Sequence, residues 1–361
     1  MNSNFNPNGQ FYGWGQQIPP SYAGYQAPYS YNPFNNEYFR QQEEKKNDTK
    51  ILKTIGMVCG FSIIAYFVLS LLSGVVIALL STIAPNMESL YEEGAGLWAF
   101  SSIATVLFIG GPFLVSYIYL KNKKMTGVLP LGTTYNKKAA TYLVMAFLPL
   151  TLVSSFVINF ISILVQSLMG VDFSSGMEDM SITGVSEFLL MTLFVAVIPA
   201  ILEEVAIRGV LLQPLRRYGD WFAIIVSAII FSLLHGNMVQ IPYTVVAGIY
   251  FGYVAVATGS IWPSIIMHFF NNFYSVLVTT FDSNLSVGLA NVLTLGTLGL
   301  MIAAGIFAFI KYKSMNYKVK LAKGVKTLKS GEKAKTVFLN IPMIIAIVFM
   351  LISTLSSISE A

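Results

Sequence analysis

Charged residues are scarce in this chain, and their scarcity excludes an ordinary soluble protein. Only 11% of the 361 residues are Asp, Glu, Lys or Arg, whereas a typical soluble domain contains about 25%. Hydrophobic residues make up 55% of the chain, and the mean hydropathy is +0.66. The composition therefore indicates a protein that crosses a membrane several times.

Cysteine and histidine are almost absent. The single cysteine, Cys59, can form no disulfide within the chain and does not report on the redox compartment. The two histidines, His235 and His268, both lie within apolar runs. Ionisable side chains are costly in a bilayer and usually face the protein interior, where they serve a function. A helix that only spanned a membrane would not need them.

Residues 1–36 lack charge of either sign and are dominated by Asn, Tyr, Gln, Pro, Gly and Phe. They contain no basic stretch followed by an apolar one, so we do not expect a cleaved signal peptide. They also contain too few aliphatic residues to build a core. We predict that residues 1–50 form a disordered, polar and aromatic tail in the cytoplasm.

Beyond this tail the chain is a succession of apolar runs, most of them long enough to cross a hydrocarbon core of about 30 Å. We predict an all-α fold, a polytopic transmembrane helix bundle of about nine spans. The fifth run is short, and its end at His235, Gly236 and Asn237 indicates a break or a re-entrant turn. The runs cover residues 55–84, 97–120, 139–169, 187–213, 221–235, 240–258, 262–280, 287–310 and 337–357.

Basic and acidic loops alternate along the chain, and this alternation predicts the orientation. All 22 Lys and Arg residues fall in four segments, and the loops between them carry acids without basic neighbours. Because cytoplasmic loops are enriched in Lys and Arg, nine spans place the N-terminus in the cytoplasm and the C-terminus outside. The net charge of +5 then reflects orientation, and we expect no nucleic-acid partner. The basic segments are 40–53, 121–138, 208–217 and 311–335.

These patterns divide the chain into four parts. The tail precedes a multi-span membrane domain at residues 51–310, which is followed by a Lys-rich cytoplasmic loop at 311–336 and a last span at 337–361. The Lys-rich loop could also contact anionic headgroups, so membrane lipids are expected partners. We predict a multi-pass protein of the cell membrane.

The fourth run carries two adjacent acids in the sequence PAILEEVAIRGVLL. Glu204 and Arg208 are four residues apart, so on a helix they can pair on one face. Glu203 projects roughly 100° away from Glu204 and is free to face something else. We therefore predict that Arg208 keeps Glu204 ionised and that Glu203 is available as a general base.

The fifth and seventh runs add two histidines and an amide. His268 and Asn272 are one helical turn apart, so both can face the bundle interior, where two such donors could stabilise an oxyanion. Glu203 with His235 could then activate water on the opposite side of a carbonyl. We expect Phe231, one turn before His235, to pack rather than to act in catalysis. Single polar residues elsewhere in the runs are expected to hydrogen-bond between helices, namely Asn159, Gln166 and Tyr243.

A competing chemistry uses the same atoms. Glu203, His235 and His268 form a ligand set known for catalytic zinc, with water in the fourth position. The chain lacks H-E-x-x-H, however, and each ligand would come from a different helix. The cofactor therefore stays open at this point, and the sequence favours a site without metal.

The segments EEVAIR (203–208), FSLLH (231–235) and HFFNN (268–272) resemble the three signature motifs of the CAAX-protease and bacteriocin-processing family: E-E-x-x-x-R, F-x-x-x-H and H-x-x-x-N. The family comprises type II CAAX prenyl endopeptidases and bacterial relatives, which are multi-helix intramembrane proteases. The motifs occur in order, within apolar runs, and hold both histidines. The resemblance covers about residues 187–280.

The resemblance implies roles that agree with those suggested by the spacing. Glu203 is the acid that activates water and His235 is its partner. His268 and Asn272 hold the oxyanion, and Glu204 and Arg208 form a supporting pair. The implied activity is that of an intramembrane endopeptidase acting on a peptide or a lipidated protein. Two alternatives are a proton-coupled transporter that uses these residues as a relay and a non-catalytic scaffold or bacteriocin immunity protein of the same fold.

Overall fold

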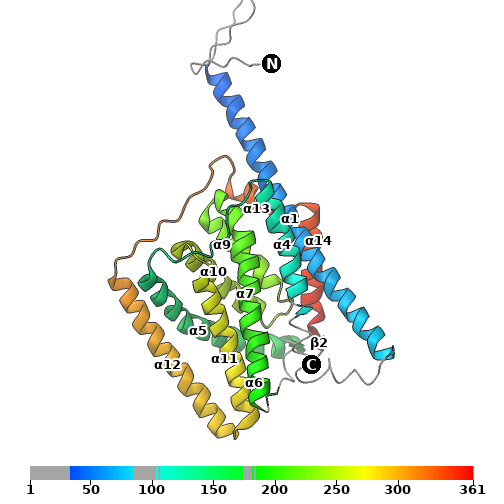
Figure 1. Cartoon of the computed structure of the whole chain (residues 1–361), viewed down its shortest axis with the longest axis vertical. Coiled ribbons are helices and arrows are strands. Elements are labelled where there is room, and N and C mark those ends of the chain that lie inside the picture. Colours follow the sequence, from blue (N-terminus) through cyan, green and yellow to red (C-terminus); the bar gives the residue numbers. More distant parts are fainter. Residues whose placement is uncertain (1–32, 84–102, 105, 174–180, 183, 361) are drawn as a thin grey trace, which may run out of the picture. The chain divides into compact units, whose positions relative to one another are not determined.

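The computed structural model describes residues 33–83, 103–104, 106–173, 181–182 and 184–360, and these are almost entirely helical (Figure 1). The chain divides into two compact units, residues 1–43 and 44–361. The predicted disorder of residues 1–32 lies outside the described residues, as does most of the loop before residue 106. Everything described below as the site lies in the second unit.

Each predicted apolar run overlaps a helix. Within the described residues, five helical segments are long and apolar enough to cross a membrane, and a sixth is added if the bent pair α13–α14 is one span. This confirms the all-α polytopic bundle, while the count of nine and the orientation stay predictions. The helices are α1 (Pro33–Ile83), η3 (Val106–Gly110), α4 (Gly111–Asn122), α5 (Lys137–Met169), α6 (Val185–Met191), η4 (Thr192–Val197), α7 (Ile198–Glu204), η5 (Val205–Leu211), α8 (Leu212–Leu215), η6 (Arg216–Tyr218), α9 (Asp220–Leu233), α10 (Ile241–Thr258), α11 (Trp262–Asn284), α12 (Val287–Ser314), α13 (Ser330–Phe338) and α14 (Ile341–Ser356).

Two helices begin inside segments in which no span was predicted. Helix α1 begins at Pro33, inside the predicted disordered tail, because the stretch that follows is rich in Gln, Glu, Lys and Arg, which are good helix formers. Helix α13 occupies the end of the predicted Lys-rich loop, and the Glu332 carboxylate caps it by accepting the Lys329 amide at 2.8 Å. A short antiparallel sheet was also not predicted; it pairs β1 (Val171–Phe173) with β2 (Ile358–Glu360).

Helices α6 to η6 form one helical segment, Val185–Tyr218, that contains two π-helical stretches. The stretches η4 and η5 lie on either side of α7, which ends at Glu204. Such wide turns occur often at functional sites. Pro199 lies in the first turn of α7, and because proline has no amide hydrogen, no α-helical bond from position 199 reaches the Val195 carbonyl.

Helices α9 and α10 form a hairpin that turns inside the bundle. Helix α9 has 14 residues and is therefore about 21 Å long. Gly236 adopts a left-handed φ of +62° in the turn, a conformation that glycine adopts without strain. The Asn237 side chain fixes the turn, since it donates to the His235 carbonyl at 2.9 Å and accepts the Gln240 amide at 2.8 Å. The predicted break after His235 is thus confirmed.

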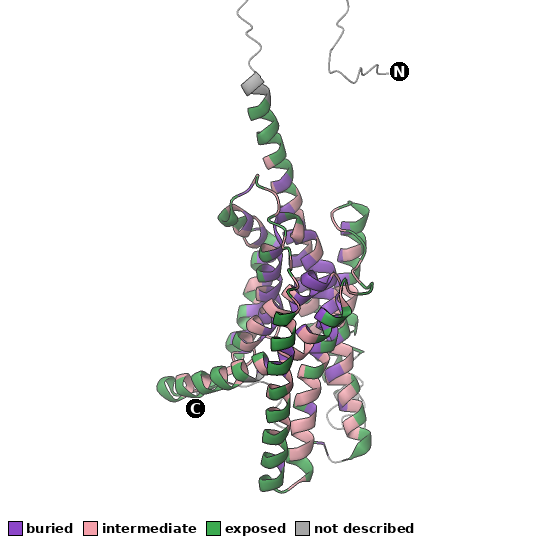
Figure 2. Cartoon of the chain, turned by 90° about the vertical axis from the view of Figure 1, so that its left-hand side faces the viewer, coloured by how far each residue is buried: buried purple, intermediate pink, exposed green. Residues whose placement is uncertain are grey.

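Burial differs strongly between the helices (Figure 2). Helix α10 is the most enclosed of the long apolar helices, with 56% of its most apolar window buried, whereas α5 and α12 have 6% and 11%. Their exposed side chains are mainly Leu, Ile, Val and Phe. Helix α1 crosses α14 closely, because a Cβ on Gly60 would lie 2.5 Å from the Met343 amide nitrogen. The site lies beside the enclosed helices.

Candidate active site

The centre of the site is a buried ion pair between Glu204 and Arg208. Arg208 Nη1 donates to Glu204 Oε1 at 2.8 Å, and neither side chain has any exposed surface. The i, i+4 pair predicted from the sequence is therefore present. A buried charge of either sign is costly without a partner, so the two residues depend on each other.

Two aromatic rings enclose the Arg208 guanidinium. Its Cζ atom lies 4.4 Å from the centre of the Phe231 ring and 5.2 Å from that of Phe251. Nη2 also donates to the Gly248 carbonyl at 3.1 Å. Cation–π contacts of this kind are worth about 2 kcal/mol when they are shielded from water. These contacts fix the plane of the guanidinium and thereby the position of Glu204.

His268 binds to the same carboxylate. Its Nδ1 atom lies 3.1 Å from Glu204 Oε1, and its Nε2 atom lies 3.9 Å from Glu203 Oε2. The ring packs against the face of Phe251, with centroids 5.6 Å apart. Because Nδ1 donates to a carboxylate, Nε2 is the ring atom available to a substrate. In the imidazolium form Nε2 also carries a proton and can donate it to an oxyanion.

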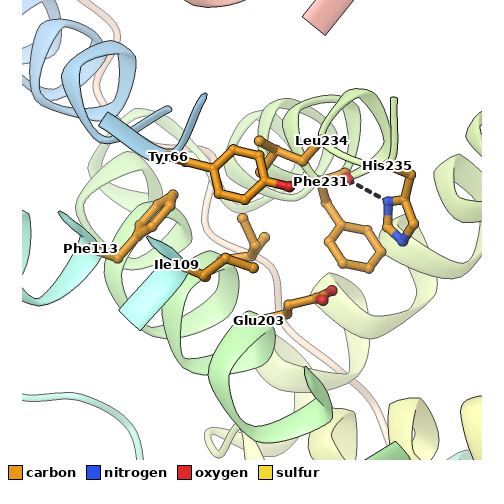
Figure 3. A pocket seen from close by; sticks show the side chains of 8 residues that line it. Tyr66, Ile109, Phe113, Glu203, Phe231, Leu234 and His235 are labelled. Carbon is orange, nitrogen blue, oxygen red and sulfur yellow. Dashed lines mark hydrogen bonds between the residues drawn. The ribbon is translucent and has the colours of Figure 1, made fainter. Parts of the chain in front are cut away.

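His235 is oriented by backbone. Its Nδ1 atom lies 2.9 Å from the Phe231 carbonyl oxygen (Figure 3). A carbonyl can only accept, so in the neutral ring Nδ1 carries the hydrogen and Nε2 carries the lone pair. The Phe231 ring meets the imidazole edge to face at 4.9 Å. His235 is therefore arranged to accept a hydrogen bond or a proton at Nε2.

Asn272 takes part in a chain of hydrogen bonds that crosses three helical segments. Its Nδ2 atom donates to the Val195 carbonyl at 2.9 Å. This is the carbonyl to which residue 199 cannot donate, because it is a proline. The Oδ1 atom of Asn272 accepts from Asn271 at 3.1 Å, and the Tyr243 hydroxyl donates to Asn271. One N–H of Asn272 is left over, since an amide nitrogen has two. The helix-to-helix hydrogen bond predicted for Tyr243 is confirmed.

Two cavities meet at Glu203, Phe231 and His235. The larger, of about 560 Å³, is also lined by His268 and Asn272, so all four residues predicted to be catalytic border one space. The smaller, of about 220 Å³, has mainly apolar walls (Figure 3). Its remaining lining residues are Tyr66, Ile109, Phe113, Ile207 and Leu234. Glu203 thus borders an apolar space on one side and a more polar one on the other.

Two aromatic residues of the site were missed from the sequence, while a third, Phe231, packs as predicted. The Phe231 ring lies against Arg208, His235 and His268. Phe251 belongs to no motif and holds Arg208 and His268. Tyr66 comes from α1, and its hydroxyl points into the smaller cavity toward Glu203 and Phe231 (Figure 3). For Phe231 the spacing to His235 was a usable signal, whereas Tyr66 is too distant in sequence to be found by pattern.

The zinc alternative requires Glu203, His235 and His268 to converge on one point. Among the described residues, no three His, Cys, Asp or Glu side chains are grouped so that they could hold a metal ion. Each histidine already uses Nδ1 for a protein contact, so only the two Nε2 atoms would be ligands. In the present arrangement these three side chains do not form a ready ligand set for zinc.

Comparison with known proteins agrees with the motifs. Residues 185–274 match the family model described as type II CAAX prenyl endopeptidase Rce1-like. The match begins at α6 and ends within α11, and it contains all six predicted site residues. No curated protein and no solved structure matches the chain. Residues 185–274 are therefore similar to the Rce1-like type II CAAX prenyl endopeptidases, a family of proteases.

Proposed function

We propose that this protein is an intramembrane endopeptidase that hydrolyses a peptide bond of a membrane-associated or lipidated polypeptide. The observation that carries the proposal is the difference between the two adjacent acids. Glu204 is fully buried and accepts from Arg208 and His268, whereas Glu203 borders both cavities together with His235. One carboxylate thus holds the site together, and the other is available to a water molecule.

The proposed reaction follows from these positions. Glu203, with His235 Nε2 accepting a hydrogen bond, takes a proton from water, and the resulting hydroxide attacks the carbonyl carbon of the substrate. Negative charge develops on the carbonyl oxygen, where the remaining Asn272 N–H donates to it, and where His268 Nε2 would donate when the ring is an imidazolium. The C–N bond then breaks as Glu203 returns its proton to the leaving nitrogen. The products are a carboxylic acid and an amine, which become a carboxylate and an ammonium once the proton passes from the acid to the amine.

The experiment compares wild-type protein with Glu203→Gln in detergent or liposomes. The probes are fluorogenic peptides that end in a CAAX-type sequence, each prepared with and without a farnesyl group on its cysteine. We expect cleavage by the wild type and none by Glu203→Gln, while the melting temperature stays the same. Asp282→Asn, at an acid near the end of α11, serves as the control and should cleave normally. Undiminished cleavage by Glu203→Gln would refute the proposal.

A further inference from the structure

A third cavity continues the larger catalytic one along α11. It has a volume of about 350 Å³ and shares four lining residues with the 560 Å³ cavity, namely Ser155, Tyr243, Asn271 and Ser275. Its other lining residues are Thr151, Tyr274, Val278 and Thr279. The two cavities therefore form one groove that leads from Glu203 and His235 to the second half of α11. We call it the polar groove.

The lining of the polar groove is unusual for a membrane bundle. In the part beyond the catalytic residues, every lining side chain except Val278 carries a hydroxyl or an amide. Polar groups at this depth are costly unless they find partners, and binding sites are typically marked by polar groups that converge on a cavity. These side chains come from three different helices, α5, α10 and α11. The side chains of Thr151, Tyr243, Asn271 and Tyr274 already hydrogen-bond within the protein. Among the described residues the hydroxyls of Ser155, Ser275 and Thr279 have no such partner, so these are the groups left for a ligand that offers hydrogen-bond donors and acceptors.

The direction of the polar groove follows from the two ends of α11. At its start, Ile261 donates to the Pro130 carbonyl at 3.0 Å, and Pro130 lies in the basic loop between α4 and α5. At its end, the Asn284 amide donates to the Ile182 carbonyl at 2.5 Å, in a loop whose charged residues are acids. Thr279 is eleven positions after His268, about 16 Å along the helix. The groove therefore runs away from the basic loops.

The hairpin of α9 and α10 leaves this side of the site accessible. The hairpin turns at residues 234–240, so α9 is only about 21 Å long, while α11 with 23 residues extends about 34 Å. Tyr243 lies in the first turn of α10, directly after this hairpin turn. Residues of α5 and of the second half of α11 line the groove, together with Tyr243.

From this geometry we propose that the polar groove binds the backbone of an extended substrate polypeptide and delivers it to Glu203 and His235 from the side opposite the basic loops. This inference rests on the proposed function. An extended chain rises about 3.3 Å per residue, so 16 Å accommodates about five residues. Hydroxyl and amide side chains suit the alternating N–H and C=O groups of such a chain and suit a lipid tail poorly.

The first test measures access without activity. Thr279→Cys and Ser275→Cys are each introduced into the full chain, and a membrane-impermeant maleimide is added to sealed vesicles from one side at a time. Asp282→Cys and Lys326→Cys mark the acidic and basic sides, and the native chain, whose Cys59 is buried, is the blank. We expect both groove cysteines to react from the side that labels Asp282→Cys. Reaction only from the side of Lys326→Cys, or none from either side, would overturn the inference.

The second test concerns the ligand. Ser275→Leu and Thr279→Leu should raise KM for a cleaved peptide about tenfold and leave kcat within about twofold, because they line the groove away from the reacting atoms. Thr297→Leu, at a half-buried position of α12 that lines neither cavity of the groove, should change neither value. An unchanged KM in both groove variants would overturn the role in backbone binding. If wild-type protein cleaves no peptide, the proposed function fails, whereas the labelling pattern still decides the direction of the groove.

Discussion

Glu204 and His268 are joined by a hydrogen bond of 3.1 Å from Nδ1 of the imidazole to Oε1 of the carboxylate, although 64 positions separate them in the chain. The same oxygen accepts from Arg208 at 2.8 Å. Glu204 therefore couples α7 to α11 and sets the direction of His268. The two neighbouring acids of the EE motif thus differ in kind, because one orients the site and the other faces its cavities.

This difference predicts opposite behaviour of two adjacent variants. Glu204→Gln removes the charge that faces buried Arg208, which should destabilise the protein by about 3–5 kcal/mol and lower kcat about 100-fold. Glu203→Gln should abolish cleavage while the melting temperature stays near that of the wild type. Thermal unfolding in detergent, followed by peptide cleavage, measures both effects. Equal melting temperatures for the two variants would contradict the assignment of Glu204 as the orienting acid.

The two histidines permit a direct spectroscopic check. Nitrogen-15 NMR of histidine-labelled protein contains signals from His235 and His268 alone. We expect the neutral His235 ring in the tautomer with hydrogen on Nδ1, because that atom faces the Phe231 carbonyl. A conservative change at Glu204, such as Glu204→Asp, should shift the His268 signals and leave those of His235 in place. The reverse pattern would show that the carboxylate acts on the other histidine.

Phe231 tests whether the aromatic enclosure supports catalysis. Phe231→Leu keeps an apolar side chain but removes the ring from Arg208, His235 and His268, so we expect a loss of about 2 kcal/mol in stability and about tenfold in kcat. Phe307→Leu is the matched control, because the exposed Phe307 ring also contacts a cation, Lys311, at 5.5 Å. The control should have wild-type kcat. If both variants behave alike, the ring at position 231 has no special role.

The sequence predicted the local relationships of the site and missed the distant ones. Glu204 and Arg208 are four residues apart, so helical periodicity alone predicts their contact. The same holds for the break after His235, where glycine and asparagine follow an apolar run. The bond from Glu204 to His268 depends on how α7 packs against α11, which no spacing along the chain encodes. The hydrogen bond from Asn272 to the Val195 carbonyl likewise depends on tertiary packing, although Pro199 in the sequence indicates that this carbonyl lacks its α-helical donor.

Tyr66 lies outside residues 185–274, the segment that matches the family model, and helix packing brings it into the site. Its hydroxyl points into the cavity beside Glu203 (Figure 3). Tyr66→Phe keeps the ring and removes only the hydroxyl, so we expect stability to be unchanged and kcat/KM to fall about tenfold, equivalent to about 1.4 kcal/mol. Tyr119→Phe, an exposed tyrosine of α4, is the control. If Tyr66→Phe has the kcat/KM of the wild type, α1 only lines the cavity and the Tyr66 hydroxyl takes no part in catalysis.

A separate cluster holds the basic side of the bundle together. The Asp48 carboxylate of α1 is buried and accepts from Arg217 Nη2 at 2.8 Å and from the Thr327 hydroxyl at 2.6 Å. The Tyr218 hydroxyl donates to the Asp48 carbonyl at 2.8 Å. The cluster thus ties α1 to the end of the Val185–Tyr218 segment and to the segment before α13. It lies at the opposite end of that segment from α6.

Asp48→Ala should therefore reduce stability without changing the chemistry. It removes the acceptor for two side chains and leaves them unpaired at a partly buried position, which should cost about 2–3 kcal/mol. Glu332→Gln is the matched control, because its ion pair with Lys45 is about 40% exposed on both sides and exposed pairs of this kind add little to stability. Denaturation in detergent compares the two variants, and kcat at a temperature where both are folded should equal that of the wild type. A lower kcat in folded Asp48→Ala would mean that the position of α1, and with it Tyr66, depends on this cluster.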